Sequence, residues 1–288
     1  GDLWPGGVGV RSPDASRRRY LLAYATDLER SRGWRDLRRL AQELADSDLA
    51  ALIYLTPINW EEMASVLSGE EVAVIYEESM NTGFGQSCRG YFLLQFLGYP
   101  KAVILHGGYQ AWVAEGLATS TDVPSPEAKS FPVDPEAASV MLTKDDMLGA
   151  IDDEAIIKLD VRDVDEWVGT SSSPYGIDFC PRKGRIPGAV WLEWYRMMKP
   201  GEEVPMFKDR TELQAECATV GITPESTVYL YCFKGARASN TYVALKEAGV
   251  KDVRLYFGSW NEWSRDPDLP IVPGDLVLSW PASCWRPT

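Results

Sequence analysis

The sequence of 288 residues contains one histidine, His106, and this scarcity excludes several kinds of site. A zinc centre built on several histidines needs more than one imidazole, and so does the His-Glu-x-x-His protease motif. Five cysteines are present without a Cys-x-x-Cys pair, which argues against zinc ribbons and thioredoxin-type redox motifs. We therefore expect no metal and no cofactor, and a function that depends on a single cysteine.

Basic residues are also in the minority, since 29 Lys and Arg face 42 Asp and Glu, for a net charge of −13. Sequence-independent nucleic-acid binding needs a basic field, so we expect no nucleic-acid partner, and any anion site must be built locally. The longest apolar run, residues 49–55, is far shorter than the roughly 18 residues of a membrane span. We therefore expect no membrane-spanning helix.

The sequence alone does not decide in which cellular compartment the protein is found. The chain starts with Gly rather than Met, which suggests that a leader or tag was removed and leaves an exported form possible. Unpaired cysteines suit a reducing cytosol, which we favour over export.

At about 150 residues per domain, the length predicts two units. We expect a first unit over residues 1–117, a Pro-, Ser- and Thr-rich linker over 118–140, a second unit over 141–273 and a tail over 274–288. Short apolar runs alternate with helical stretches in the second unit, which predicts an α/β fold with a mostly parallel sheet and helices on both faces. The predicted elements are strands at 156–161, 227–231 and 252–257, and a helix at 236–248 that ends at Gly249.

An internal repeat relates the two units. The matching segments are 73–76 with 228–231, 107–112 with 258–263, and 49–55 with 186–192. Where the second unit has Cys232, the first has Glu77. We therefore expect the second unit to be the working copy, and the first to be an inactive copy with solvated acids at Glu77 and Glu78.

Cys232 lies where a predicted strand passes through a short loop into a helix. Loop amides and the helix N-terminus can form an anion nest there, and Lys234 and Arg237 add positive charge. This setting favours the thiolate, the nucleophilic form, and Gly235 permits the backbone turn that the loop needs. The alternative is an inert strand-end cysteine of the core.

The segment from Cys232 to Arg237, of pattern Cys-x-x-Gly-x-Arg, resembles the active-site loop of the rhodanese sulfurtransferases. Three other motifs of that family follow its order: Leu159-Asp160-Val161-Arg162 before Glu166-Trp167, Gly184-Arg185-Ile186-Pro187-Gly188-Ala189, and Gly258-Ser259-Trp260-Asn261-Glu262-Trp263. The whole chain resembles a tandem-domain rhodanese of the thiosulfate/mercaptopyruvate sulfurtransferase family. Its first unit is similar to the inactive amino-terminal domain, with LLAYAT at residues 21–26 in place of Asp-x-Arg.

The resemblance implies two rhodanese-like domains and a double-displacement reaction. The Cys232 thiolate takes a sulfur atom from a small anionic donor such as thiosulfate, and the persulfide passes it to cyanide or a thiol. Lys234 and Arg237 are then expected to bind the donor, while Arg162 and Arg185 are either substrate ligands or structural ion-pair residues. Asp160 supports the loop, and the persulfide is held by the amides of Phe233, Gly235, Ala236 and Ala238.

Several alternatives remain open at this stage. Mercaptopyruvate sulfurtransferases have a neutral loop, so the two cations of this loop favour thiosulfate, while a persulfide donor is also compatible. A cysteine phosphatase places its arginine six positions after the cysteine, whereas Arg237 lies five positions after Cys232. A persulfide carrier without turnover is a further alternative, and Cys180 is either a second sulfur-accepting thiol or a loop cysteine.

Overall fold

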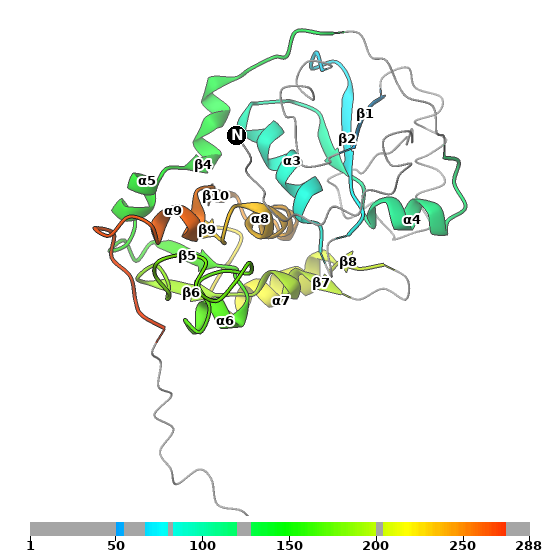
Figure 1. The fold of residues 1–288 in the computed structure, drawn as a ribbon. Helices are drawn as coiled ribbons and strands as arrows, with labels where there is room; N and C mark the ends of the chain where they lie inside the picture. Colours follow the sequence, from blue (N-terminus) through cyan, green and yellow to red (C-terminus); the bar gives the residue numbers. More distant parts are fainter. Residues whose placement is uncertain (1–49, 55–66, 80–82, 120–127, 200–203, 275–288) are drawn as a thin grey trace, which may run out of the picture.

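A computed structural model describes residues 50–54, 67–79, 83–119, 128–199 and 204–274 (Figure 1). The predicted features at residues 21–26, at the end of the tail and in part of the linker lie outside these ranges. No helix among the described residues is long and apolar enough to cross a membrane.

A five-stranded parallel sheet forms the centre of the second unit, in the order β4-β10-β9-β5-β6. Its strands are β4 (Met141–Leu142), β5 (Ile156–Asp160), β6 (Ala189–Trp191), β9 (Thr227–Tyr231) and β10 (Asp252–Tyr256). The helices around it are α5 (Lys144–Gly149), α6 (Val164–Trp167), α7 (Arg210–Ala218), α8 (Ala236–Ala248) and α9 (Ser259–Trp263). Two short 3-10 helices, η3 (Pro135–Val140) and η4 (Trp194–Met197), and an antiparallel pair, β7 (Met198–Lys199) and β8 (Met206–Phe207), complete this part.

This architecture confirms the predicted α/β class. The apolar run of β9 is central in the sheet, and α8 ends where Gly249 adopts a left-handed conformation with φ of 93°, which glycine tolerates. The carboxyl end of β9 therefore leads directly through the Cys232 loop into α8.

The first unit contains a smaller parallel sheet in the order β1-β2-β3. Its elements are β1 (Ala50–Tyr54), β2 (Val72–Tyr76), α3 (Gly85–Phe96), β3 (Ala102–Ile104) and α4 (Gly108–Ala114). Within the predicted linker, Phe131 stacks on Tyr99 of this unit at 5.4 Å between ring centroids, and η3, at the end of the linker, contacts both α3 and β10.

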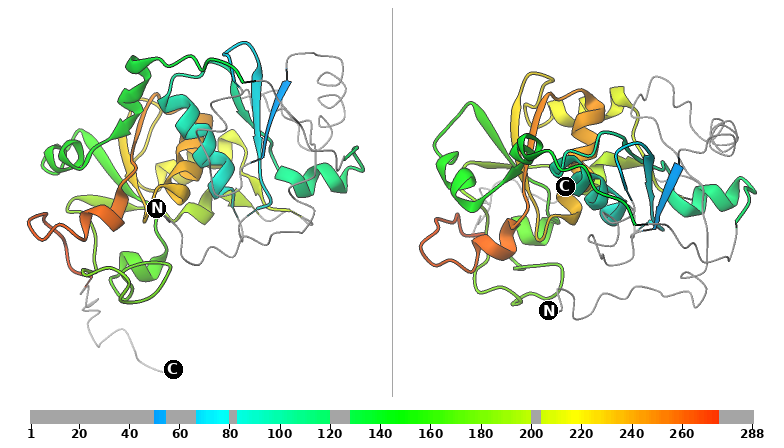
Figure 2. Two further views of the ribbon diagram at one scale, coloured as in Figure 1. Left: turned by 45° about the horizontal axis from the view of Figure 1, so that its top comes forward. Right: turned by 90° about the horizontal axis from the view of Figure 1, so that it is seen from above.

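Helix α3 of the first unit lies alongside α8 of the second, as Figures 1 and 2 show from different directions. Phe92 of α3 contacts Tyr242 of α8 edge to face, with ring centroids 5.1 Å apart. Phe84, Cys88 and Phe92 belong to the same buried cluster as Cys232 and the strands of the main sheet. The two units thus share a hydrophobic core, and the first unit lies close to the Cys232 loop.

The repeat is visible in the backbone. The Trp260 amide donates to the Cys232 carbonyl at 3.0 Å, and the Tyr109 amide donates to the Glu77 carbonyl at the same distance. Gly108 and Ser259 also share a left-handed conformation, with φ of 61° and 54°. The predicted match of residues 49–55 with 186–192 does not hold in the strand order. β1 pairs with β2, the strand that corresponds to β9, whereas β6 pairs with β5 at the sheet edge and is not a neighbour of β9.

Glu77 corrects one sequence-based expectation. Glu78 is exposed, but Glu77 is buried, and its carboxylate accepts the backbone N–H groups of Gln86 and Ser87 and the Ser87 hydroxyl at 2.8–3.1 Å. Burial raises its pKa to about 7, although these hydrogen bonds act in the opposite direction. In the first copy, a side chain of the protein itself thus occupies the anion-binding position at the start of α3.

Candidate active site

Cys232 lies directly after β9 and only 1% of its surface is exposed. Its Sγ accepts the Gly235 N–H at 3.1 Å, so the loop turns an amide toward the sulfur. Its own amide donates to Ser259 Oγ at 3.2 Å, and that hydroxyl donates to the Tyr256 carbonyl at 2.8 Å. The motif that begins α9 therefore fixes the backbone on which the thiol stands.

Gly235 is required by this geometry. It precedes α8 with φ of 86°, and a Cβ there would lie 3.0 Å from ring atoms of Phe257. Ala236 and Ala238 form the first turn of the 13-residue helix that follows, so the positive end of its dipole is directed at the loop. The predicted persulfide cradle thus lies at the amino end of α8.

Arg237 is held by carboxylates. Its guanidinium pairs with both oxygens of Glu166, at 2.5 and 3.0 Å, and with Asp163 at 3.0 Å. Burial is the largest single influence and would lower the pKa of Arg237. The charge and hydrogen bonds of Glu166, together with the charges of Cys232 and Asp163, outweigh it and keep the pKa above its ordinary value. Arg237 therefore adds little net charge to the site, because two acids neutralise it.

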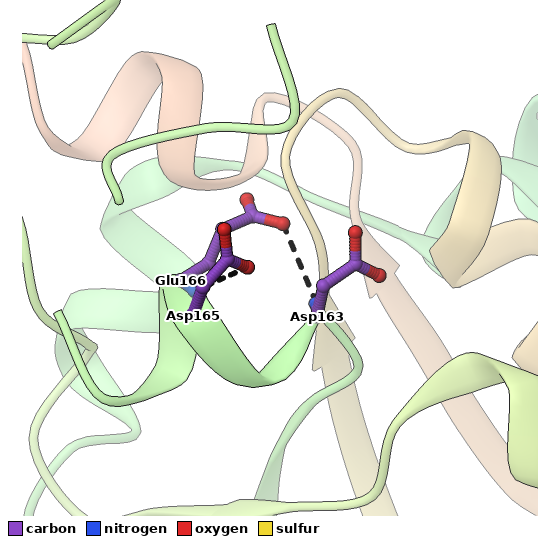
Figure 3. A group of neighbouring side chains, drawn as sticks. All are labelled: Asp163, Asp165 and Glu166. Carbon is purple, nitrogen blue, oxygen red and sulfur yellow. Dashed lines mark hydrogen bonds between the residues drawn. The ribbon is translucent and has the colours of Figure 1, made fainter. Parts of the chain in front are cut away.

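Asp163, Asp165 and Glu166 form a group whose carboxylate oxygens lie within 4.8 Å of one another (Figure 3). Asp163 and Glu166 form the capping box of α6, in which Glu166 Oε2 accepts the Asp163 amide at 3.4 Å. Asp163 and Glu166 both pair with Arg237, and Asp165 accepts the Glu166 N–H at 2.9 Å, so we assign this group to holding that arginine rather than a metal ion.

Arg162 and Asp160 form a second buried pair. Both side chains are fully buried, and Arg162 donates to Asp160 at 2.6–3.1 Å and to the Gly184 carbonyl at 2.8 Å. Asp160 also accepts the Tyr231 hydroxyl at 2.7 Å, one residue before Cys232. With no exposed atom, the Arg162 side chain fits the structural alternative, and Asp160 supports the loop through Tyr231.

Arg185 is nearly buried and donates to the Trp167 carbonyl at 3.1 Å. Its guanidinium lies over the Trp167 ring, 4.4 Å from the centroid. Its backbone pairs with Val272, so it joins the second motif to the end of the unit. These contacts also fit a structural role.

Lys234 is surrounded by aromatic rings. Its ammonium lies 5.5–5.6 Å from the centroids of Tyr175, Phe179 and Phe233. Tyr175 and Phe179 belong to the segment between α6 and β6 and remain 43% and 41% exposed. The ammonium and these rings form a wall beside the loop that can contact both a charged and an apolar part of a ligand.

Arg89 was not anticipated from the sequence. It lies on α3 of the first unit, with its guanidinium 4.8 Å from the centroid of the Phe257 ring. The Gly235 backbone packs against the same Phe257 ring, so Arg89 lies close to the active loop. The repeat placed Glu77 at the equivalent of Cys232 but gave no signal that α3 itself reaches the second copy.

The other singled-out residues have structural contacts. Cys180 is buried, and its Sγ lies 3.8 Å from both Asn261 Oδ1 and an Arg265 nitrogen. His106 Nε2 accepts the Phe207 N–H at 2.9 Å, and burial lowers its pKa to about 4. The four cysteines in the described part of the chain are all free thiols.

Comparison of the sequence with known proteins identifies the family of this chain. Residues 143–266 match the rhodanese-like domain. The putative thiosulfate sulfurtransferase SseA of Mycobacterium bovis is 32% identical over 227 residues, 76% of this chain and 73% of the relative. The thiosulfate sulfurtransferase of Pseudomonas aeruginosa is 31% identical over 206 residues, 70% of each chain. The sulfur carrier protein TtuD of Thermus thermophilus is 30% identical over 234 residues, 76% of this chain and 78% of the relative.

A solved structure supports the fold. A variant of EanB, described as a persulfide in a tetrahedral intermediate state with ergothioneine, superposes with a TM-score of 0.68 at 21% identity. This chain spans 66% of the length of that structure, and 80% of this chain is covered. With relatives above 30% identity over most of their length, and the domain match centred on the Cys232 sheet, the chain belongs to the rhodanese family of sulfurtransferases.

Proposed function

We propose that the protein transfers the outer sulfur of thiosulfate to a thiophilic acceptor through a persulfide on Cys232. The observation on which this rests is the thiol at the amino end of α8, where Sγ already accepts the Gly235 N–H at 3.1 Å. An amide and a helix N-terminus aimed at one sulfur atom stabilise the negative charge of a thiolate, and then that of a persulfide.

The first half-reaction is a displacement at sulfur. The thiolate attacks the outer sulfur of thiosulfate, a new S–S bond forms, the S–S bond of the donor breaks, and its electron pair leaves with sulfite. In the second half-reaction, cyanide or a thiolate attacks the outer sulfur of the persulfide and the Cys232 thiolate is regenerated. Each step conserves charge and atoms, and neither needs an oxidant or a metal.

The residues around the sulfur have separate tasks in this proposal. Amides of the loop from Phe233 through Gly235 and Ala236 to Ala238 hold the persulfide, and Lys234 attracts the donor's sulfonate group. Arg237, neutralised by Glu166, fixes the helix against α6 rather than supplying free charge. Arg162 and Arg185 act as structural residues around Asp160 and Trp167.

Two related activities are compatible with the same thiol. TtuD, a relative of similar identity, is named a sulfur carrier, which favours a persulfide that is passed to a partner protein without rapid turnover. A mercaptopyruvate donor would present a carboxylate in place of a sulfonate to the same cations. Thiosulfate is preferred because it is a dianion and Lys234 is not paired with a carboxylate in the described residues.

Steady-state kinetics with cyanide as acceptor separate these activities. Thiocyanate formation is measured with thiosulfate and with mercaptopyruvate, with Cys232→Ser as the inactive control. The proposal predicts double-displacement kinetics and a higher kcat/KM for thiosulfate. A higher value for mercaptopyruvate would contradict the donor assignment, and stoichiometric loading without turnover would identify a carrier.

A further inference from the structure

The three arginines of the sequence motifs around the active loop have their charge met by protein groups. Arg237 pairs with Glu166, Arg162 pairs with Asp160, and Arg185 donates to a backbone carbonyl and stacks on Trp167. Arg89 differs because it forms no ion pair within the described ranges. Its Nε is buried without a hydrogen-bond partner, as is Nη1 of the paired Arg162.

The position of Arg89 is fixed by packing on both units. Its guanidinium lies over the Phe257 ring, 4.8 Å from the centroid, and atoms of that same ring lie 3.0 Å from where a Gly235 Cβ would be. Phe257 also stacks on Phe92 of α3 at 5.9 Å. The arginine therefore stands one aromatic ring away from the glycine whose amide contacts the Cys232 sulfur.

The start of α3 is held by Glu77, whose carboxylate accepts the amides of Gln86 and Ser87. Arg89 follows two residues later on the same helix. The acid that replaces the cysteine in the first copy thus anchors the helix that delivers an arginine to the second copy.

The charged groups around Arg89 are consistent with this position beside the active loop. Burial lowers the pKa of Arg89, and the groups that oppose this effect are Cys232 and Tyr175, with no carboxylate among them. A cation in this position stays charged at neutral pH, since arginine is protonated far above it. Among the described residues no carboxylate pairs with it, so its charge is not neutralised within this part of the protein.

We propose that Arg89 of the first unit is a substrate-binding residue that contacts the anionic group of the sulfur donor and of the departing sulfite beside Cys232. This assignment rests on the proposed function for the identity of the anion. The first unit, although it has no cysteine at the catalytic position, then completes the active site of the second. Lys234 and Arg89 would together supply the positive charge that Arg237, Arg162 and Arg185 do not.

Alkylation of Cys232 tests the charge at this position without relying on sulfur transfer. Iodoacetate and iodoacetamide react with the same thiolate and have similar size, but only iodoacetate is anionic. The ratio of their rate constants, followed by mass spectrometry of the Cys232 peptide, cancels changes in accessibility or nucleophilicity. The variants are Arg89→Met, Arg89→Lys and, as a matched control, Arg254→Met, which removes an arginine paired with Asp252 on β10.

We expect Arg89→Met to lower the iodoacetate-to-iodoacetamide ratio by about tenfold at low salt, because a unit charge acts at short range in a partly buried site. Arg89→Lys should retain most of the ratio, and Arg254→Met should not change it. Arg89→Gln replaces Arg89→Met if the latter does not fold. An unchanged ratio in the uncharged variant would overturn the assignment.

Donor kinetics then separate this inference from the proposed function. If the parent protein uses thiosulfate, kcat/KM for thiosulfate should fall about tenfold in Arg89→Met and recover in Arg89→Lys. If the parent does not use thiosulfate, the proposed donor is wrong, but a lowered alkylation ratio still supports an anion-binding role for Arg89. A lowered ratio with unchanged kcat/KM for thiosulfate would contradict its contact with the donor.

Discussion

The buried pair between Arg237 and Glu166 makes the most quantitative prediction. Arg237 is bound through two hydrogen bonds by Glu166, whose side chain is fully buried, and by the more exposed Asp163. Removing one partner of a buried ion pair costs about 3–5 kcal/mol, because the remaining charge is stranded. Since Asp163 still neutralises Arg237, we expect Glu166→Gln to lower the free energy of unfolding by about 2–4 kcal/mol.

A double-mutant cycle with Arg237→Met measures the pair itself. Urea unfolding at pH 7 of the parent, the two single variants and the double variant gives the coupling energy. We predict a favourable coupling of about 2 kcal/mol, so that the double variant is more stable than the sum of single effects implies. Additive effects, with coupling below about 0.5 kcal/mol, would refute the view that Glu166 holds Arg237.

Three further predictions follow from individual contacts. Gly235→Ala should cost about 1–3 kcal/mol of stability and strongly slow sulfur loading of Cys232, because φ is 86° and the new Cβ meets Phe257. Gly249→Ala, at the other end of α8 with φ of 93°, should lower stability in a thermal melt and leave loading unchanged; equal loading defects in both would argue against a specific role for Gly235. His106 has its pKa lowered to about 4, so the unfolded chain gains a proton first as the pH falls below 6.5. About 2 kcal/mol of stability should be lost between pH 7.5 and 5, and His106→Gln should lack this component in urea titrations. Lys234→Met should raise KM for thiosulfate more than for a neutral acceptor thiol, and an equal effect on both would exclude donor binding by Lys234.

Local features of the sequence predicted the second unit well. The strand at 227–231 and the helix at 236–248 are observed with the predicted bounds, and Gly249 ends the helix as expected. These elements are specified by nearby residues: a run of apolar side chains, a glycine turn and a glycine cap. The Cys232 loop was identified for the same reason, since its residues are consecutive.

The charge state of the site was harder to predict because it depends on distant partners. Arg237 and Lys234 are equivalent as cations in a sequence, yet Glu166 neutralises the first, and aromatic rings surround the second. The sequence predicted a solvated carboxylate at Glu77, whereas in the structure this carboxylate accepts hydrogen bonds from the amides of Gln86 and Ser87 in α3. Spacing along a chain gives no information on such contacts.

The position of Arg89 was also not predictable from the sequence, because it depends on a contact between the two units. Its helix lies in the copy without a cysteine at the catalytic position, and only the packing of α3 against α8 brings it to the active loop. The internal repeat places Glu77 of the first copy at the position of Cys232, but it gives no sign that α3 approaches the Cys232 loop. That information is in the tertiary fold.

The central claim is that Cys232 becomes a persulfide, and intact-protein mass spectrometry tests it most directly. The parent and Cys232→Ala are incubated with thiosulfate, desalted and weighed before and after addition of cyanide. The account predicts a gain of one sulfur atom in the parent that cyanide removes, and no gain in Cys232→Ala. A gain that survives in Cys232→Ala would contradict the account and direct attention to Cys180, and no gain in the parent would exclude thiosulfate as the donor.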